Sequence, residues 1–237
     1  MQLHEISEHN TKIWVSEHIQ ADFKGDWFDC AHSSESVMSG NWKSGRQEIS
    51  HLTVGDLSLV LRHYYRGGLP ARLSKDQFIF HGFVHSRPFK EIRLLQYMQQ
   101  LGLPVPEPIA ARCKVNGILY NADILMSEIT DSKTLMQTIS ENALEQDMWV
   151  RVGEVIAKFH QQGIQHVDLN ANNILLDKAG SVYLIDFDRC KQRTFSQSWA
   201  NAGLARLKRS LDKQKLVNKD INFEQRNFDS LIRGYQT

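Results

Sequence analysis

The most informative stretch of this chain is His166-Val-Asp-Leu-Asn-Ala-Asn-Asn-Ile-Leu-Leu176, followed shortly by Leu184-Ile-Asp-Phe-Asp188. Two apolar runs, Ile174–Leu176 and Val182–Ile185, are separated here by Asp177-Lys-Ala-Gly180. Strand, tight turn and strand is the simplest interpretation. These stretches therefore predict a β-hairpin that presents polar residues at both of its ends.

Three polar side chains flank the predicted hairpin: Asp168 and Asn173 precede it and Asp186 follows it. Because a hairpin brings its two ends together, we expect these side chains to converge. Two carboxylates and an amide oxygen suit a hard cation such as Mg²⁺, and phosphoryl transfer needs such a metal together with a carboxylate that orients the attacking hydroxyl. The alternative is a pair of surface turns, in which Asp and Asn are common. The full spacing between apolar strands favours a phosphoryl-transfer site.

The composition is that of an ordinary globular protein, with 41% hydrophobic and 23% charged residues in 237. A formal net charge of +1 argues against a general nucleic-acid binder. The widely spaced Cys30, Cys113 and Cys190 form no CxxC pair, which excludes a disulfide framework and a zinc site. The first ten residues lack the apolar run of a signal peptide, and no apolar run approaches the roughly 18 residues of a membrane span. We expect a soluble or peripheral protein of the cytoplasm.

The front half of the chain is rich in short β-like runs, notably Leu57–Leu61 and Ile124–Ser127. One strong helix interrupts them, beginning near Arg87 and capped by Gly102. Its apolar stripe contains Leu94, Leu95, Met98 and Leu101, and Glu91 lies on the same stripe. A carboxylate on a buried stripe needs a partner, so Glu91 should face a cation.

The back half is mainly helical apart from the hairpin. A second apolar stripe, which ends at Gly163, contains Leu144, Met148, Val152, Val155, Ile156 and Phe159. The polar remainder from about Ser196 onward is also expected to be helical. An extended connector, Leu103-Pro-Val-Pro-Glu-Pro108, lies between the first helix and the next strand. We therefore predict an α+β protein of two lobes with a cleft between them, comprising residues 1–127 and 128–237.

The pattern H-x-D-L-x-x-x-N…D-F-x resembles the catalytic and metal-binding loops of the protein-kinase-like fold. The resemblance implies that Asp168 is the catalytic base, Asp186 the principal metal ligand and Asn173 a second ligand. Two departures stand out. Val167 replaces the usual arginine, which implies activity without activation-loop phosphorylation, and Asp188 replaces the glycine of D-F-G, as is common in kinases of small molecules and lipid-linked sugars.

The same resemblance implies an ATP-binding N-lobe, with an antiparallel sheet and one main helix, and a mostly helical C-lobe. Arg62 in Leu59-Val-Leu-Arg62 takes the place of the lysine that binds the α- and β-phosphates, with Glu91 as its ion-pair partner. Arginine keeps the charge and can hold phosphate through two nitrogens. Gly40 and Gly45 stand where the family has its phosphate-covering loop, although the third glycine is missing and an ordinary turn explains the pair equally well. An unrelated surface arginine and helix glutamate are the alternative for Arg62 and Glu91.

Four strings narrow the resemblance to the 3-deoxy-D-manno-octulosonic acid (Kdo) kinases of the lipopolysaccharide kinase family. They are Leu61-Arg-His-Tyr-Tyr-Arg-Gly-Gly68, Leu103-Pro-Val-Pro-Glu-Pro-Ile-Ala-Ala111, residues His166–Leu176 (hereafter the catalytic stretch) and Ile185-Asp-Phe-Asp-Arg189. The resemblance implies ATP- and Mg²⁺-dependent phosphorylation of the 4-hydroxyl of Kdo on a lipid A precursor. It also implies a location at the cytoplasmic side of a Gram-negative inner membrane.

Such an acceptor is acidic and amphiphilic, so local basic surface is expected. Arg66 and Arg72, around the Gly67-Gly68 turn, are candidates for its carboxylate. A second basic segment, Leu204-Ala-Arg-Leu-Lys-Arg-Ser-Leu211, places three leucines on one helical face. This helix either docks its leucines on the helical lobe, which we favour, or lies on an anionic membrane.

Two other functions stay open. One is a kinase for another lipopolysaccharide sugar such as heptose, or for an aminoglycoside-like molecule, although a cationic acceptor calls for acidic rather than basic surroundings. The other is a pseudokinase that only binds, which the incomplete glycine loop, Arg62 and Val167 favour and the retained Asp168, Asn173 and Asp186 oppose.

Overall fold

The computed structural model describes residues 3–29, 41–44, 47–66 and 76–237. The chain divides into two compact units. The first contains residues 1–100 and 106–128, and the second contains residues 101–105 and 129–237. Each unit has its own sheet and helices. The predicted lobes 1–127 and 128–237, with their separate roles, stay a prediction.

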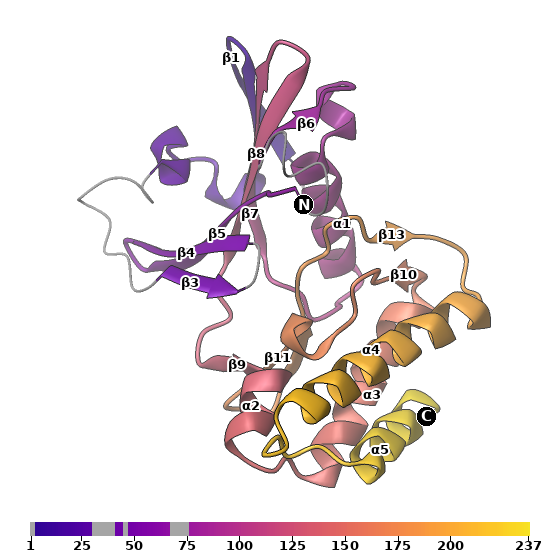
Figure 1. Cartoon of the computed structure of the whole chain (residues 1–237). Helices are drawn as coiled ribbons and strands as arrows, with labels where there is room; N and C mark the ends of the chain where they lie inside the picture. The colour runs from indigo at the N-terminus through magenta and orange to yellow at the C-terminus, as the bar shows by residue number, and fades with distance from the viewer. Residues whose placement is uncertain (1–2, 30–40, 45–46, 67–75) are drawn as a thin grey trace. The chain divides into compact units, whose positions relative to one another are not determined.

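The described part of the first unit is built on an eight-stranded antiparallel sheet in the order β1-β2-β7-β8-β5-β4-β3, with β6 paired to β8 (Figure 1). The strands are β1 (Leu3–Glu8), β2 (Thr11–Ser16), β3 (Asn41–Ser44), β4 (Gln47–Val54), β5 (Leu57–His63), β6 (Phe78–Ile79), β7 (Pro108–Asn116) and β8 (Leu119–Ser127). The two β-like runs predicted from the sequence are therefore confirmed as parts of β5 and β8.

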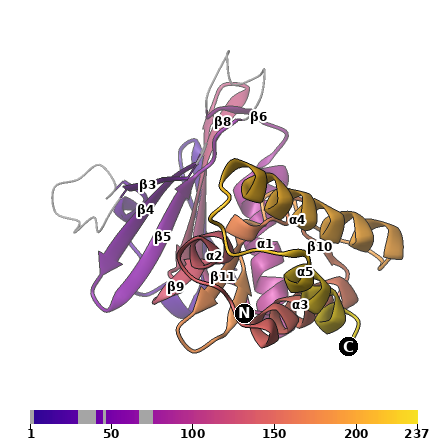
Figure 2. The same ribbon diagram turned by 60° about the horizontal axis from the view of Figure 1, so that its bottom comes forward.

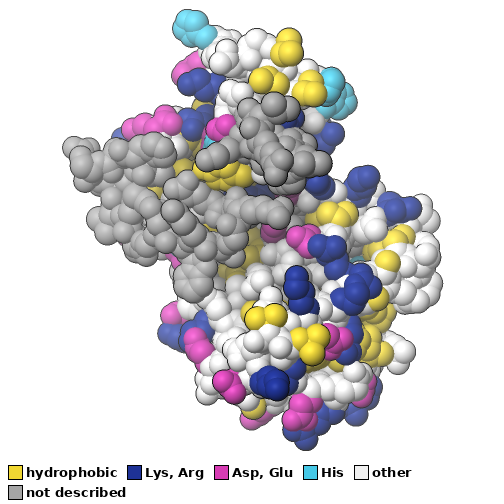
Figure 3. All heavy atoms as spheres, in the orientation of Figure 1, with side chains coloured by type: hydrophobic (Ala, Val, Ile, Leu, Met, Phe, Trp, Pro, Cys, Tyr) yellow, Lys and Arg dark blue, Asp and Glu magenta, His cyan; other side chains and the backbone are white. Residues whose placement is uncertain are grey.

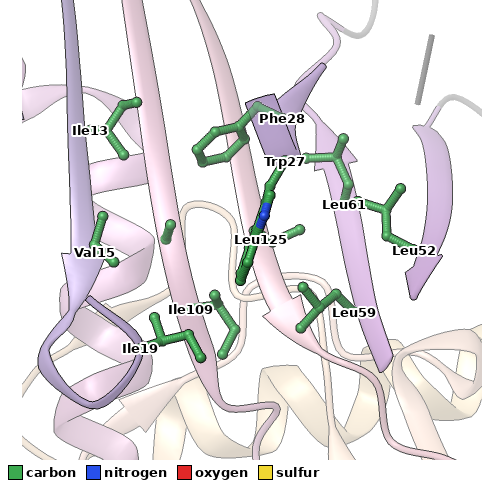
Figure 4. Packing of buried hydrophobic residues seen from close by; sticks show 11 residues of the cluster. Ile13, Val15, Ile19, Trp27, Phe28, Leu52, Leu59, Leu61, Ile109 and Leu125 are labelled. Atoms are coloured by element: carbon green, nitrogen blue, oxygen red, sulfur yellow. The ribbon is translucent and has the colours of Figure 1, made fainter. Parts of the chain in front are cut away.

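Both faces of this sheet are covered, as the alternation along β2 shows. Successive side chains of a strand point to opposite faces. Trp14 stacks on Phe89 of α1 (Arg87–Gln100) with ring centroids 4.1 Å apart, while the neighbouring Ile13 and Val15 enter a separate hydrophobic cluster. Figure 4 shows that cluster, in which side chains of β2, β4, β5, β7 and β8 meet those of the segment after β2: Ile13, Val15, Ile19, Trp27, Phe28, Leu52, Leu59, Leu61, Ile109 and Leu125.

The α1 helix forms as predicted, with one correction to its buried stripe. Leu95 and Met98 are fully buried, and Gly102 adopts a φ of 68° just beyond the helix, as a C-terminal glycine does. Leu101, however, is 37% exposed. It lies after the last helical residue, Gln100, so the helical spacing that would bury it no longer applies. Ile92, fully buried, is the apolar neighbour of Glu91 instead.

The second unit is mainly helical, with α2 (Leu135–Glu141), α3 (Gln146–Gln161), α4 (Gln197–Val217) and α5 (Gln225–Tyr235). Figure 2 shows α3 and α5 side by side. Two glycines allow this close approach, because a Cβ on Gly153 would lie 1.9 Å from the Leu231 carbonyl oxygen, and one on Gly234 would lie 2.0 Å from that of Val150. The predicted stripe of α3 omitted Trp149, which is fully buried.

The predicted hairpin is confirmed as β11 (Ile174–Asp177) and β12 (Val182–Leu184), which pair antiparallel, with β9 (Ser132–Thr134) on the other side of β11. A separate pair is formed by β10 (Ile164–Gln165) and β13 (Lys191–Gln192). The basic helix is α4, and the preference for docking is confirmed, since its leucines are 6%, 0% and 0% exposed at Leu204, Leu207 and Leu211.

The structure is thus a mixed α and β protein with a large antiparallel sheet, as the α+β prediction requires, and this is consistent with a kinase-like fold. Across the described ranges, none of the helices combines the length and the apolar character that crossing a membrane demands.

Candidate active site

Three hydrogen bonds order the catalytic stretch, and two of them tie it to the far end of the hairpin. Asn173 donates from Nδ2 to the carbonyl oxygen of Asp168 at 2.9 Å, and the Ile185 amide donates to the carbonyl oxygen of Asn173 at 3.1 Å. Nε2 of the buried His166 lies 2.9 Å from the Ile185 carbonyl oxygen. The segments that carry Asp168, Asn173 and Asp186 are therefore tied together through the backbone. The convergence of the three side chains stays a prediction.

Asp168 presents a half-exposed carboxylate, 49% exposed, which is bound by an arginine from a distant helix. Arg206 of α4 donates from Nε to Oδ1 of Asp168 at 2.9 Å and also donates to it from Nη2. Both bonds end on Oδ1, so within the described residues Oδ2 of Asp168 accepts no hydrogen bond. The arrangement orients the carboxylate and leaves one oxygen accessible to a hydroxyl.

Asp186 adopts an unusual backbone conformation, with a φ of 64°. Left-handed φ is uncommon outside glycine and is best tolerated by Asp and Asn. The following Phe187 is 1% exposed and stacks on Phe159 with ring centroids 5.8 Å apart. Burial of Phe187 therefore anchors the segment after β12 that carries both Asp186 and Asp188.

The donor set at the end of the hairpin fits Mg²⁺. Because Asn173 uses Nδ2 to bind Asp168, its amide group is oriented, and Oδ1 is the atom left to ligate a cation. Asp186 adds a carboxylate, and Mg²⁺ favours few protein oxygens with the remaining positions held by water and phosphate. No cluster of three His, Cys, Asp or Glu side chains suited to a metal occurs among the described residues. A magnesium site formed by Asn173 and Asp186 stays a prediction.

The first unit contains the predicted ion pair between Arg62 of β5 and Glu91 of α1, with both residues 3% exposed. A buried carboxylate of this kind needs a cation and further donors. Tyr64 is such a donor, because its hydroxyl donates a hydrogen bond to Oε2 of Glu91 at 2.6 Å. The Arg62 guanidinium lies 4.8 Å from the Tyr64 ring centroid. Burial, together with the Glu91 charge, raises the pKa of Tyr64 well above its ordinary value. Tyr64 thus stays a neutral donor to Glu91.

The other predicted site residues are less completely described. Arg66 places its guanidinium 5.6 Å from the ring centroid of Phe78. Gly40, Gly45 and Arg72 lie outside the described residues. The nucleotide-loop and Arg72 assignments therefore stay predictions.

Two site residues were missed by the sequence reasoning. Tyr64 was noted only as part of a family string. Because side chains alternate along an extended chain, its place two residues after Arg62 puts both side chains on the same face of the sheet. Arg206 was noted only as a charge on an amphipathic helix. It lies 38 positions from Asp168, and no local pattern connects the two.

Comparison with known proteins identifies the class. Residues 34–235 match the model of the lipopolysaccharide kinase (Kdo/WaaP) family. The chain belongs to this family, and the prediction of a kinase is confirmed.

Individual relatives agree along most of the chain. A 3-deoxy-D-manno-octulosonic acid kinase of Vibrio parahaemolyticus is 34% identical over 98% of this chain and 97% of its own length. A protein of the same name from Photobacterium profundum is 31% identical over 99% and 98%. One from Haemophilus influenzae is 39% identical over 76% of both chains.

Proposed function

We propose that this chain transfers the γ-phosphoryl group of ATP to the 4-hydroxyl of Kdo on a Kdo-bearing lipid A precursor, in the synthesis of the lipopolysaccharide inner core. The names of the similar proteins support the acceptor sugar. The 4-hydroxyl and the lipid-linked precursor rest on the resemblance of the sequence strings.

The observation that carries the proposal is the carboxylate of Asp168, oriented through Oδ1 by Arg206 and through its backbone by Asn173. Oδ2 of Asp168 would accept the proton of the acceptor hydroxyl. The acceptor oxygen then forms its bond to the γ-phosphorus while the bond from that phosphorus to the bridging oxygen breaks, and ADP leaves. A fixed carboxylate favours this step because it orients the attacking oxygen before reaction.

The other predicted residues would bind the nucleotide, the metal or the acceptor in this proposal. Arg62, held by Glu91, would bind the α- and β-phosphates, with Gly40 and Gly45 in the covering loop. Asp186 and Asn173 would hold Mg²⁺, which offsets negative charge on the phosphates when it is bound. Arg66 and Arg72 are candidates for the sugar carboxylate.

We also propose the finer architecture and location that the resemblance implies. The fold would be bilobal and protein-kinase-like, with an N-lobe of residues 1–127 and a C-lobe of residues 128–237. A lipid-linked acceptor would bring the chain to the cytoplasmic side of the inner membrane of a Gram-negative bacterium, with peripheral attraction to anionic lipids.

Two alternative functions differ from this proposal: one in the acceptor that is phosphorylated, and the other in whether phosphate is transferred at all. A kinase for another lipopolysaccharide sugar would label an acceptor that lacks Kdo. A pseudokinase would bind nucleotide without transferring phosphate to any acceptor, but its residues Asp168, Asn173 and Asp186 would have no reason to keep the spacing of a catalytic site.

The test is transfer of radiolabelled γ-phosphate, with Mg²⁺, to a Kdo-bearing lipid A precursor and to the same lipid without Kdo. The proposal predicts label only on the Kdo-bearing lipid. A third acceptor with 4-deoxy-Kdo tests the position, and it should stay unlabelled. Label on the lipid without Kdo would overturn the sugar assignment, and ATP binding without transfer to any acceptor would support the pseudokinase.

A further inference from the structure

One face of α4 carries three cations at helical spacing. Arg206, Arg209 and Lys213 stand at positions i, i+3 and i+7, which lie along one side of a helix. All three are exposed. Arg206 binds the carboxylate of Asp168, so this side of the helix faces the catalytic stretch.

A pocket of about 350 Å³ lies between this helix face and the catalytic stretch. Its walls include Asp168, Asn170 and Asn172 on one side and Arg206, Arg209 and Lys213 on the other. The volume is in the range of small-ligand sites. Amides and cations line most of it, which suits a ligand that is polar and negatively charged.

The charges in this pocket are not balanced within the second unit. Asp168 compensates Arg206. Across the described residues, neither Arg209 nor Lys213 takes part in an ion pair, whereas Lys208 of the same helix is bound to Asp212 at 2.6 Å. The cation that points away from the pocket is therefore neutralised by its own helix, while those that line the pocket keep their charge for a ligand.

Figure 3 shows Lys and Arg side chains in dark blue over the part of this surface where α4 lies. From Arg206 to Lys213 the helix rises about 10 Å. An anionic group held by Arg209 and Lys213 would therefore be displaced along the helix from the carboxylate of Asp168 by a distance comparable to the size of a monosaccharide.

We propose that Arg209 and Lys213 bind the carboxylate of the acidic sugar acceptor and so place its reacting hydroxyl at Asp168. This inference rests on the proposed function, and it assigns the sugar carboxylate to a specificity site within the second unit, in place of the candidates Arg66 and Arg72. A guanidinium can hold a carboxylate through two parallel hydrogen bonds, and a lysine adds a point charge. A neutral sugar of the same shape would leave both cations unpaired and bind more weakly.

The experiment combines variants of the protein with variants of the acceptor. Arg209→Gln, Lys213→Gln and the double variant are compared with Arg226→Gln, an exposed arginine at the start of α5 that lines no part of this pocket. Each protein is assayed in neutral detergent micelles with the Kdo-bearing lipid and with its carboxyl methyl ester. Each single variant should raise the acceptor KM about tenfold, with kcat and the KM for ATP unchanged.

The decisive comparison is the ester with the double variant. The ester should bind the wild-type protein and Arg226→Gln about tenfold or more weakly than the acid, yet it should bind the double variant no more weakly than the acid does. An acid-to-ester ratio in the double variant equal to that of the wild type would overturn the proposal. Two further results would overturn the proposal. One is loss of the acid-to-ester discrimination in Arg66→Gln while the double variant keeps it. The other is a defect of the double variant that is seen only on anionic vesicles, which would assign these cations to a membrane surface.

Failure of the proposed function gives a different result. Wild-type protein that labels no Kdo-bearing lipid contradicts the function itself. Binding of the free sugar acid, followed by NMR on the wild type and the double variant, still tests the carboxylate site: weaker binding by the double variant supports it, and equal binding overturns it.

Discussion

Arg206 of α4 donates two hydrogen bonds to a single oxygen, Oδ1, of Asp168. A carboxylate held in this way has one oxygen fixed by the protein and the other available to substrate. The pair also ties α4 to the catalytic stretch, across 38 positions of sequence. The cations on the same face of α4 are thereby placed beside the candidate active site.

Replacing the catalytic base Asp168 should sharply reduce phosphoryl transfer without weakening ATP binding. In Asp168→Asn the side chain keeps its shape but loses its ability to take a proton, and we expect kcat to fall by about 10²- to 10⁴-fold. ATP binding, measured by calorimetry, should be nearly unchanged. Asp131→Asn, at an exposed carboxylate paired with Lys178, is the matched control and should keep wild-type activity. Transfer by Asp168→Asn at the wild-type rate would remove Asp168 from the mechanism.

Arg206 acts as a positioning residue in this scheme. Arg206→Gln should lower kcat about tenfold while the KM for ATP stays constant, because the carboxylate loses its two donors and reorients. Arg206→Lys should recover part of the rate, since lysine supplies charge but cannot reproduce the two-nitrogen contact. Steady-state kinetics with both substrates varied would check this. Equal rates for the Gln variant and the wild type would show that the contact is irrelevant to turnover.

The buried pair in the first unit should matter to folding as well as to nucleotide binding. Glu91→Met leaves Arg62 buried without its carboxylate, and we expect the free energy of unfolding to fall by about 3 to 5 kcal/mol. The double variant Arg62→Met/Glu91→Met should be more stable than Glu91→Met, because it removes the uncompensated charge. Urea denaturation measures both values. A double variant less stable than Glu91→Met would contradict this account.

The contact between α3 and α5 should tolerate no side chain at Gly153. A Cβ there would lie 1.9 Å from the carbonyl oxygen of Leu231, so Gly153→Ala should cost about 3 kcal/mol of stability by forcing the helices apart. Gly203→Ala is the control, as the nearest atom to its Cβ would be 3.8 Å away, on His160. That change in α4 should be neutral or stabilising by about 0.5 to 1 kcal/mol, because alanine is the better helix former.

His160 should make the protein less stable in mild acid. Burial, with a smaller contribution from the nearby charge of His166, lowers the pKa of His160 from 6.5 to about 4, and its Nδ1 lies 2.9 Å from the Tyr235 hydroxyl. Between pH 6.5 and about 4 the unfolded chain binds a proton at this histidine that the folded chain does not. The contribution of His160 to stability is therefore fully present above pH 6.5 and is lost as the pH drops toward 4. Between pH 7 and pH 5 the loss should be on the order of 2 kcal/mol.

The check is urea unfolding of the wild type and of His160→Gln at both pH values. The variant cannot take up this proton, so its stability should change less between them. An equal change in the two proteins would assign the acid sensitivity to other groups.

The local elements and the identity of the catalytic stretch could be predicted from the order of residues alone. The hairpin of β11 and β12, the α1 helix and the docked leucines of α4 all follow from periodicity and turn residues, which depend on near neighbours in the chain. The ion pair of Arg62 and Glu91 was also predictable, because a glutamate on a buried stripe requires a cation and the family resemblance named one.

Which distant residues meet depends instead on how the helices and strands pack. Arg206 is one of several charges on α4, and its contact with Asp168 depends on how that helix packs, which no local pattern encodes. The strands before residue 30 and the burial of Trp27 and Phe28 were likewise not predicted, since their partners are far along the chain. Side-chain periodicity specifies which face of an element is buried, but the partner of that face is chosen by packing of the whole unit.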